Sequence, residues 1–590
     1  MYISIGVLFE TLLNHWLLAS VSIVILYNLG YAIYNLYFHP LAKFPGPFLA
    51  KLSGWPNYYY ATTGYRHIWI WQCHQIYGKF LSRSSQLKFH AMPCHAIPFL
   101  ARAPMPPYLT PHPGSAVRFK PDGVLWNTPS AYRTIHQAKA NVCRGPFYSV
   151  FARNAQDVNT VNTTDTAIHT RKRKVLNKVF SAEAVRSAED FVIHHVDRWN
   201  ELLMQDDSAD ERGEEKKGGV KEKGWTRGKN MSEWVDCLLF DIMGDLCFGK
   251  SFGLMEPVEN PFKHLPQTIA DSMLFMFPIA HSPLYRFLRW VKPRGFDSLA
   301  EIIAPKNVKQ YYDFIETNLN KRAEEEKLRK AQGLEKEGRK DMLHYLFNAT
   351  DDAGNPAYSP EELKAESNML MIAGTDTTAT SIVGFWFHIL RYPKVYEKLV
   401  EEIRTTFKKA EDIEMGPTLS SCKYLQACID ESLRVAPAAC GELAREVQAG
   451  GYVIEGSYVP EGTDVGVTGW AIMHNEEHFP DPWVFRPERW MVNPETGVTA
   501  EDVARAQAAI MPFSVGQWNC VGQKVAMIDM MIMAARTLWR MDVRLVSGDT
   551  VGGGKMELGW GMRSKDQIVL KDAYIALKDG PMAQFRKRIF

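Results

Sequence analysis

The chain has 590 residues, of which 46% are hydrophobic and 23% are charged, as is usual for a globular protein. Its formal net charge at pH 7 is only +2, so charge gives no support to nucleic-acid binding. The nine cysteines are scattered without a CxxC pair, which argues against a disulfide framework and against a zinc ribbon. A protein of a reducing compartment is the simplest interpretation.

The N-terminal segment carries a membrane signal. Residues 11–42 contain no formally charged side chain apart from two histidines, and the run 16–38 is rich in Leu, Ile, Val and Tyr. At about 1.5 Å per residue, a helix over this run can cross a ~30 Å hydrocarbon layer. The segment lacks a basic n-region and a small-residue cleavage site, so a membrane anchor over residues 1–43 is favoured over a signal peptide. A buried core helix is the alternative.

Charges at the two ends of this span predict its orientation. Glu10 precedes the span, whereas Lys43 and Lys51 follow it, so the positive-inside rule places the bulk of the chain in the cytosol. Residues 44–47 read Phe-Pro-Gly-Pro, which cannot continue a helix. We expect a stiff elbow here, followed by one globular domain over residues 44–590.

Residues 81–116 differ in composition from the rest of the chain. They contain seven prolines, three histidines and no acidic residue. Their prolines prevent a central strand, so we expect an irregular insertion. A retained intron or a mistaken gene model is the simplest account of this segment. A genuine lineage-specific loop is the alternative.

The remainder is predicted to be mainly helical with small β-sheets. Apolar residues recur at spacings of three and four in residues 183–204, 308–330, 360–391, 393–410, 421–434 and 523–540. Strand-like stretches are residues 117–127, 451–459 and 464–468, with weaker ones after 555. Residues 205–229 carry seven acidic and seven basic side chains with almost no apolar ones, which predicts a charged surface loop.

One cysteine lies in a distinctive loop. Residues 513–522 read Phe-Ser-Val-Gly-Gln-Trp-Asn-Cys-Val-Gly and precede the predicted helix 523–540. Glycines let the backbone pass close to a flat ligand, and a helix N-terminus stabilises a thiolate. A single cysteine ligand suits haem iron better than zinc, which normally takes three or four protein ligands. A buried structural cysteine is the plain alternative for Cys520.

This loop resembles the haem-binding signature of the cytochrome P450 family, Phe-x-x-Gly-x-Arg-x-Cys-x-Gly. Phe513, Gly516, Cys520 and Gly522 match the signature, whereas Trp518 stands where the family has arginine. The resemblance implies that Cys520 supplies the axial thiolate of haem b. Because the family's arginine meets a haem propionate, arginine in place of Trp518 is expected to preserve or strengthen haem retention.

Three further motifs lie in the family's order. Residues 373–378 read Ala-Gly-Thr-Asp-Thr-Thr within the predicted helix 360–391 and resemble the distal-helix motif. By that match, Asp376 and Thr377 are the catalytic residues and deliver protons during oxygen activation. A solvent-facing polar patch is the alternative.

The second motif pairs Glu431-x-x-Arg434 with the later segment 485–490, which reads Phe-Arg-Pro-Glu-Arg-Trp. It resembles the family's Glu-x-x-Arg helix and Pro-Glu-Arg-Phe loop, and the resemblance implies a buried structural cluster of Glu431, Arg434 and Arg489. The third motif is the basic segment that begins at His169. It resembles the propionate-binding helix, so His169 and Arg173 are expected at the propionates, as is Arg445.

The resemblance covers residues 38–588 with 81–116 outside it. It also implies that Tyr77–Phe80, joined directly to Val117–Val124, would form one strand and turn, so the insertion would fall inside a strand. Residues 38–47 are similar to those of membrane-bound fungal members that act in secondary metabolism. It implies a cytochrome P450 fold behind one transmembrane helix in the endoplasmic reticulum membrane, with the catalytic domain in the cytosol. The implied activity inserts one atom of dioxygen into a lipophilic small molecule. The electrons would come from NADPH through a separate flavoprotein reductase, because the chain has no Gly-x-Gly-x-x-Gly fingerprint.

Other functions stay open at this point. A haem-thiolate isomerase or dehydratase would need no external electrons, but Asp376 and Thr377 favour oxygen activation. A haem binder inactivated by the insertion, or a membrane-tethered interaction protein, are further alternatives. The side chains expected to line the substrate pocket are small or apolar, which suits a lipophilic substrate. They are Met369, Met371, Ile372, Ala438, Ala439 and Cys440.

Overall fold

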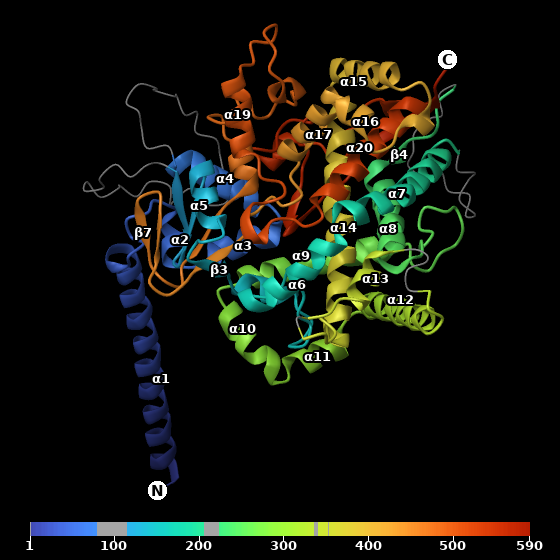
Figure 1. Cartoon of the computed structure of the whole chain (residues 1–590). Coiled ribbons are helices and arrows are strands. Elements are labelled where there is room, and N and C mark those ends of the chain that lie inside the picture. The colour runs from blue at the N-terminus through green and yellow to red at the C-terminus, as the bar shows by residue number, and fades with distance from the viewer. Residues whose placement is uncertain (1, 79–114, 206–223, 335–339, 352, 590) are drawn as a thin grey trace.

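The computed structural model describes residues 2–78, 115–205, 224–334, 340–351 and 353–589. It is mainly helical, as the sequence predicts (Figure 1). The α-helices are α1 (Tyr2–Ile33), α2 (Phe48–Leu52), α3 (Trp55–Thr63), α4 (Arg66–Tyr77), α5 (Pro129–His136), α6 (Thr166–Val179), α7 (Ala182–Leu203), α8 (Met231–Phe248), α9 (Leu265–His281), α10 (Tyr285–Val291), α11 (Phe296–Ile303), α12 (Lys306–Ala331), α13 (Met342–Phe347), α14 (Pro360–Ile389), α15 (Pro393–Thr406), α16 (Pro417–Ser421), α17 (Lys423–Val435), α18 (Gly469–Met473), α19 (Ala500–Ala509) and α20 (Gln523–Arg540).

The strands form small sheets. They are β1 (Ala116–Lys120), β2 (Gly123–Trp126), β3 (Val142–Arg144), β4 (Lys229–Asn230), β5 (Arg445–Val447), β6 (Tyr452–Ile454), β7 (Ser457–Val459), β8 (Asp464–Val467), β9 (Met541–Leu545), β10 (Lys571–Ala573), β11 (Ile575–Leu577) and β12 (Met582–Lys587). The largest sheet has the order β1-β2-β8-β5-β3, in which only β2 and β8 run parallel. The other sheets are β4-β12-β9, β10-β11 and β6-β7.

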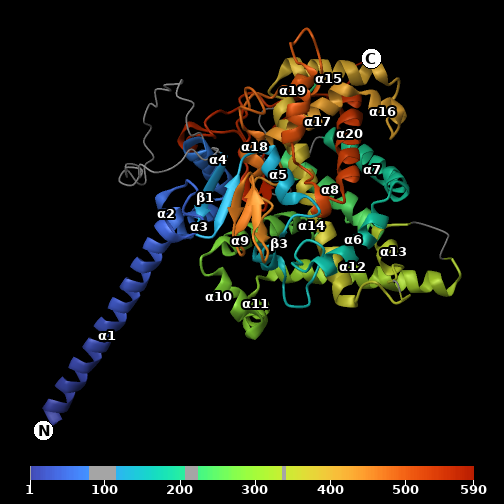
Figure 2. The same ribbon diagram turned by 60° about the vertical axis from the view of Figure 1, so that its left-hand side comes forward.

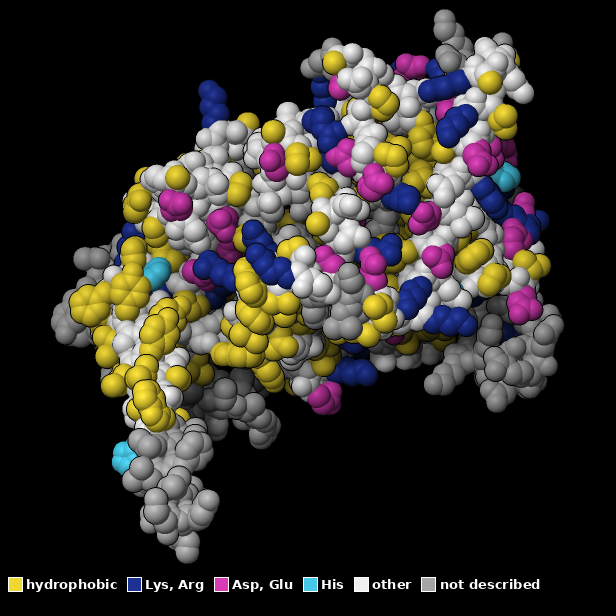
Figure 3. Space-filling view, turned by 90° about the horizontal axis from the view of Figure 1, so that it is seen from below, with side chains coloured by type: hydrophobic (Ala, Val, Ile, Leu, Met, Phe, Trp, Pro, Cys, Tyr) yellow, Lys and Arg dark blue, Asp and Glu magenta, His cyan; other side chains and the backbone are white. Residues whose placement is uncertain are grey.

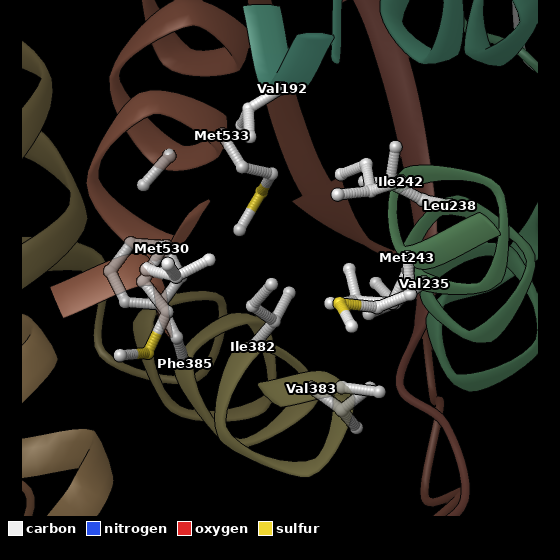
Figure 4. Packing of buried hydrophobic residues seen from close by; sticks show 14 of the residues in the cluster. Val192, Val235, Leu238, Ile242, Met243, Ile382, Val383, Phe385, Met530 and Met533 are labelled. Atoms are coloured by element: carbon white, nitrogen blue, oxygen red, sulfur yellow. The ribbon is translucent and has the colours of Figure 1, made fainter. Parts of the chain in front are cut away.

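Helix α14 runs through the middle of the molecule and packs most extensively on α8. Figure 4 shows the core where side chains of α7, α8, α14 and α20 meet, including Val192, Leu238, Ile382 and Met533. These side chains are at most 3% exposed. Burying each of them removes enough apolar surface from water to contribute about 1.5–3 kcal/mol. The core therefore holds α14 rigidly beside the segment that contains Cys520.

Helix α1 projects away from the globular body (Figures 1 and 2). It continues into one π-helical turn, η1 (Tyr34–Phe38), and residues Leu18–Phe38 have the length and hydropathy of a membrane span. The predicted elbow lies against β1: a Cβ atom at Gly46 would stand 2.1 Å from the carbonyl oxygen of Arg118. The Arg118 guanidinium also donates to the backbone oxygen of Asn35 in η1 at 2.7 Å. These contacts attach the end of the anchor helix to the main sheet.

The long periodic helices lie where the sequence predicts them, with small shifts of their ends. Helix α20 agrees at both ends, and α7, α12 and α17 agree within two residues. The predicted helix 393–410 stops earlier, at Thr406, because Phe407 adopts an extended conformation. Two predicted strands are hairpins instead: residues 117–127 form β1 and β2, and residues 451–459 form β6 and β7. The second hairpin turns at Glu455 and Gly456, both in the left-handed region.

The structure corrects two other expectations, on the residues that precede the insertion 81–116 and on the end of the loop 205–229. Tyr77 ends helix α4, and Gly78 keeps a helical conformation, so these residues do not form the expected strand continuous with β1. Residues 79–114 lie outside the described residues, and Ala116 already pairs with Trp126 in the sheet. The C-terminal end of the predicted loop 205–229 is ordered, because Thr226 donates its backbone N–H to Phe585 and β4 pairs with β12.

Candidate functional site

The loop that carries Cys520 closes on itself just before α20. The backbone N–H of Cys520 donates to the carbonyl oxygen of Phe513 at 2.7 Å. The Cys520 side chain is exposed to an internal cavity that is also lined by α14 and by residues 513–522. Burial raises the pKa of this thiol, whereas the backbone N–H groups of Gly522 and Gln523 and the charge of Arg173 oppose that rise. A metal ion at the sulfur would add a much stronger pull toward the thiolate.

The two glycines of the motif have different roles. Gly516 has a φ of +74°, and a Cβ atom there would stand 1.9 Å from the carbonyl oxygen of His136. Only glycine fits this position. Gly522 has an ordinary φ of −82°, and a Cβ atom there would meet no atom of the described residues closer than 3.8 Å. Gly522 borders the cavity, so a larger side chain at this position would project into the cavity and displace a bound ligand.

Trp518 is buried, and its indole packs between an aromatic ring and two cations. Its ring centroid lies 3.8 Å from that of His169, and the guanidinium of Arg144 lies over the indole at 4.3 Å. The guanidinium of Arg445 is 5.7 Å from the same ring. Burial, followed by the charges of Arg144, Arg173 and Arg445, lowers the pKa of His169 to about 3, so this histidine is neutral. Trp518 therefore serves as a platform for cations.

Arg144 is a site residue that the sequence analysis missed. It is the register partner of Arg445 in the antiparallel pair of β3 and β5. Like charges directly opposite one another destabilise a sheet. The Nε atoms of both arginines are buried and have no hydrogen-bond partner among the described residues, and the same holds for the Tyr132 hydroxyl, which also borders the cavity. No local sequence signal marks Arg144, because strand pairing alone brings it to Arg445.

Arg173 lies at the same end of the cavity. Its Nη2 donates to Asn519 Oδ1 at 2.7 Å, and its Nη1 donates to the backbone oxygen of that residue. Arg144 and Arg173 thus line the cavity beside the thiol, and Arg445 adds a third guanidinium next to Trp518 without lining the cavity itself. This donor set fits a haem: the sulfur suits its iron, the arginines suit its two propionates, and the apolar walls suit its porphyrin.

The wall formed by α14 shows which residues of the distal motif reach the cavity. Thr377 and Gly374 line it, and Thr377 Oγ1 donates to the Ala373 carbonyl at 2.7 Å. A Cβ atom at Gly374 would lie 2.5 Å from the side chain of Met243, so this glycine allows α8 to approach. Asp376 is not among the cavity-lining residues.

Asp376 is buried on another side of α14, and its Oδ2 has no partner within the described part of the chain. Burial raises the pKa of this carboxyl to about 7, although the nearby Lys578 charge opposes the rise. Lys578 itself forms an ion pair with Asp236. The carboxyl can therefore gain or lose a proton near neutral pH, next to a charged pair.

Glu431, Arg434 and Arg489 form one buried charge cluster. Glu431 Oε1 accepts from Arg434 Nη2 at 2.8 Å and from Arg489 Nε at 3.0 Å, while Trp490 Nε1 donates to Oε2 at 3.0 Å. Arg434 also donates to the backbone oxygens of Met473 and Pro482, both at 2.8 Å. The cluster ties α17 to α18 and to the segment 480–490.

The expected pocket residues divide into two groups. Met369, Ala438 and Ala439 line the cavity. Met371 and Cys440 are fully buried in the core instead, and Ile372 packs against that core. The segment 437–443 gives the cavity an apolar wall, whereas α14 contributes Met369 and Leu370 together with the hydroxyl groups of Thr377, Thr378 and Ser381.

Comparison with known proteins agrees with this geometry. The family model of Cytochrome P450 matches residues 120–565. The chain is 30% identical to the cytochrome P450 monooxygenase fscF of Fusarium equiseti over 97% of both chains. It is 31% identical to the cytochrome P450 monooxygenase apf7 of Gibberella fujikuroi over 94% of this chain and 95% of the relative. The resemblance found in the sequence motifs is confirmed, and this chain belongs to the cytochrome P450 family of monooxygenases.

Proposed function

We propose that this protein is a haem-thiolate monooxygenase in which the Cys520 sulfur holds the haem iron. One observation carries the proposal: Cys520, Thr377, Arg144 and Arg173 line the same cavity. Arg445 does not line it but lies over the ring of Trp518, which does. When bound, the haem would supply the chemistry that splits dioxygen and places one oxygen atom in the substrate. A lipophilic secondary-metabolite intermediate is the substrate class that the resemblance implies.

The protein's own groups hold and tune that site. The N–H groups of Gly522 and Gln523 point to the Cys520 sulfur and stabilise negative charge there. Arg144, Arg173 and Arg445 would bind the propionates, so the charge missing at Trp518 is supplied by β3 and β5. The buried cluster around Glu431 would keep the cysteine loop in place without touching substrate.

Thr377 and Asp376 divide the task of proton delivery in this proposal. The Thr377 hydroxyl borders the cavity and can hold a proton donor there by a hydrogen bond. Asp376 stands behind the helix with a carboxyl pKa of about 7, so it can pass protons from the side of Lys578 and Asp236. Electrons would come from NADPH through a separate flavoprotein reductase, which the family membership implies.

Membrane attachment is part of the proposal. Figures 1 and 2 place α10 and α11 on the side of the body toward which α1 projects, and Figure 3 shows hydrophobic side chains gathered beside the anchor. Large apolar side chains there are more than half exposed: Phe275, Leu284, Phe287, Trp290, Ile302 and Ile303. A patch of this kind fits a membrane surface. We infer a single-pass protein of the endoplasmic reticulum membrane with its catalytic domain in the cytosol.

The test is the absorption spectrum of the reduced, carbon monoxide-treated protein. Wild type should show the red-shifted Soret band of a thiolate-ligated haem, and Cys520→Ala should abolish it. Cys237→Ala removes a half-buried thiol from α8 and serves as the control, which should keep the band. Survival of the band in Cys520→Ala would overturn the assignment of the ligand.

A haem-thiolate isomerase or dehydratase is the second candidate, and the placement of Thr377 in the cavity argues against it. The two functions separate in one assay: a monooxygenase turns over only with NADPH, reductase and dioxygen, whereas the isomerase needs none of them. Metabolite profiling of a host that expresses the chain with a reductase would identify the substrate.

A further inference from the structure

A small cavity of about 10 Å³ has a mostly apolar lining into which the polar side chains of His281 and Asp572 are set. Of two larger cavities, the inner one, about 280 Å³, contains Cys520, and the outer one, about 380 Å³, is lined in part by η1 at the end of the anchor helix. Phe147 and His281 line both the small and the outer cavity, whereas Gly441 and Tyr574 line both the small and the inner cavity. The small cavity therefore lies between the outer cavity and the cavity of Cys520 and shares walls with both.

A chain of hydrogen bonds fixes the proton of His281. Arg66 Nε donates to Asn57 Oδ1 at 2.6 Å, which turns the Asn57 amide nitrogen toward His281 Nδ1, 3.3 Å away. Burial, followed by the charge of Arg66, lowers the pKa of His281 well below its ordinary value, so the ring is neutral. Because Nδ1 accepts, the proton is on Nε2. That N–H is buried and has no partner among the described residues.

Asp572 supplies a complementary group. Its side chain is fully buried in the wall of the small cavity, and its Oδ2 has no partner among the described residues. Arg66 lies close by, but its guanidinium makes two short bonds to Glu442, at 2.6 and 2.7 Å. Burial raises the pKa of Asp572 to about 7. The small cavity thus presents one unpaired donor and one unpaired carboxyl oxygen.

We propose that the small cavity binds a hydroxyl group of the substrate, between His281 Nε2 and Asp572 Oδ2. The inference rests on the proposed function and adds a substrate class to it: a lipophilic molecule that carries an alcohol or a phenol. A volume of this size holds about one oxygen atom. A hydroxyl both accepts and donates, so it satisfies both groups, whereas an alkyl group leaves both unpaired. An ammonium group would satisfy Asp572 but not the N–H of His281.

The experiment uses the haem-loaded full chain and a series of 1-alkylimidazoles of increasing chain length, ended by methyl, hydroxyl or ammonium. The imidazole binds the haem and shifts the Soret band, so each titration gives a Kd. At the chain length that reaches the small cavity, the hydroxyl probe should bind about tenfold tighter than the methyl probe. If the hydroxyl and methyl probes bind equally at every chain length, the small cavity holds water alone and the inference is overturned. Tighter binding of the ammonium probe than of the hydroxyl probe would also overturn it.

Three variants test the residues. Asp572→Leu and His281→Phe each remove one polar group, and both should lose most of the hydroxyl preference. Gly441→Ala leaves both groups in place but puts a Cβ atom 3.2 Å from Asp572 Oδ2, so it should abolish the preference by filling the space. Asp430→Asn is the matched control, because Asp430 lines none of the three cavities and the preference should stay.

Failure of the hydroxyl site and failure of the haem-thiolate assignment give different results. Equal loss of affinity for the methyl and hydroxyl probes in all three variants would mean a structural role only and would overturn the inference. If a variant does not fold, the ratio of the Kd values of the methyl and hydroxyl probes for the wild-type protein still tests the inference. Absence of the thiolate-type Soret band in wild type would instead overturn the proposed function, on which the inference rests.

Discussion

Replacing Trp518 by arginine separates the two contributions that this position makes to haem retention. The indole contacts the guanidinium groups of Arg144 at 4.3 Å and Arg445 at 5.7 Å. Cation–π contacts contribute about 0.5–2 kcal/mol each, so losing both costs about 1–4 kcal/mol. Arginine at 518 can donate to a propionate, and a charge-assisted hydrogen bond contributes about 1.5–3 kcal/mol. The two changes nearly cancel, so Trp518→Arg should retain haem at least as well as wild type.

Trp518→Leu is the matched variant, because it loses the cation–π contacts and gains no charge. The assay is the rate of haem transfer to excess apomyoglobin, together with the melting temperature of each holoprotein. We expect Trp518→Leu to lose haem about tenfold or more faster than Trp518→Arg, since about 1.4 kcal/mol corresponds to a factor of ten. If the arginine variant loses haem as fast as the leucine variant, no propionate lies within reach of residue 518 and the reasoning fails.

Three further changes have defined outcomes. Thr377→Ala should keep its haem but release more peroxide per NADPH oxidised, since the hydroxyl positions a proton donor; unchanged coupling would remove Thr377 from the mechanism. Asp376 has a folded-state pKa of about 7, above its ordinary 3.8, so its contribution to stability is present below about pH 4 and is lost as pH rises through 7. Asp376→Asn should therefore gain at most about 4 kcal/mol over wild type at pH 8 and nothing at pH 4, measured by urea unfolding; equal curves at both pH values would contradict this. The expected insertion 81–116 overlaps β1 at Ala116, so the deletion to test is 81–114. That chain should bind haem at least as well as the full chain, and a transcript that encodes the segment in most copies would exclude a retained intron.

How far the sequence predicts the fold depends on how each element is buried. Helices with one apolar face, such as α7 and α17, show a clear period and were predicted within two residues of their ends. Helix α8 is not predicted, although Val235, Leu238, Leu239, Ile242, Met243 and Leu246 follow the helical spacing. Its polar side is buried too, since Asp241 and Asp245 are at most 9% exposed. The hairpin β6-β7 was predicted as one stretch because its two-residue turn interrupts the apolar pattern only briefly.

The candidate site likewise has parts that are contiguous in the sequence and parts that only the fold brings together. The cysteine loop is contiguous, so its residues and their order could be read directly from the sequence. In the proposed function Arg144 would supply the charge that Trp518 lacks, and its position depends on the pairing of β3 with β5. The placement of Asp376 outside the cavity depends on the rotation of α14, which the motif alone does not fix.

The pairing of Arg144 with Arg445 offers a physical reason why a tryptophan can stand at position 518, where the family has arginine. Two arginines in direct register, with buried Nε atoms unpaired, are unfavourable in an empty sheet. The arrangement becomes favourable when negative charge lies between them and the cavity, and the flat indole of Trp518 holds both guanidinium groups in that position. In the proposed haem-bound protein, the two propionates would offset the repulsion that remains between these guanidinium groups. Stability of this part of the protein should therefore depend on the haem propionates more strongly than in a relative whose loop carries the arginine itself.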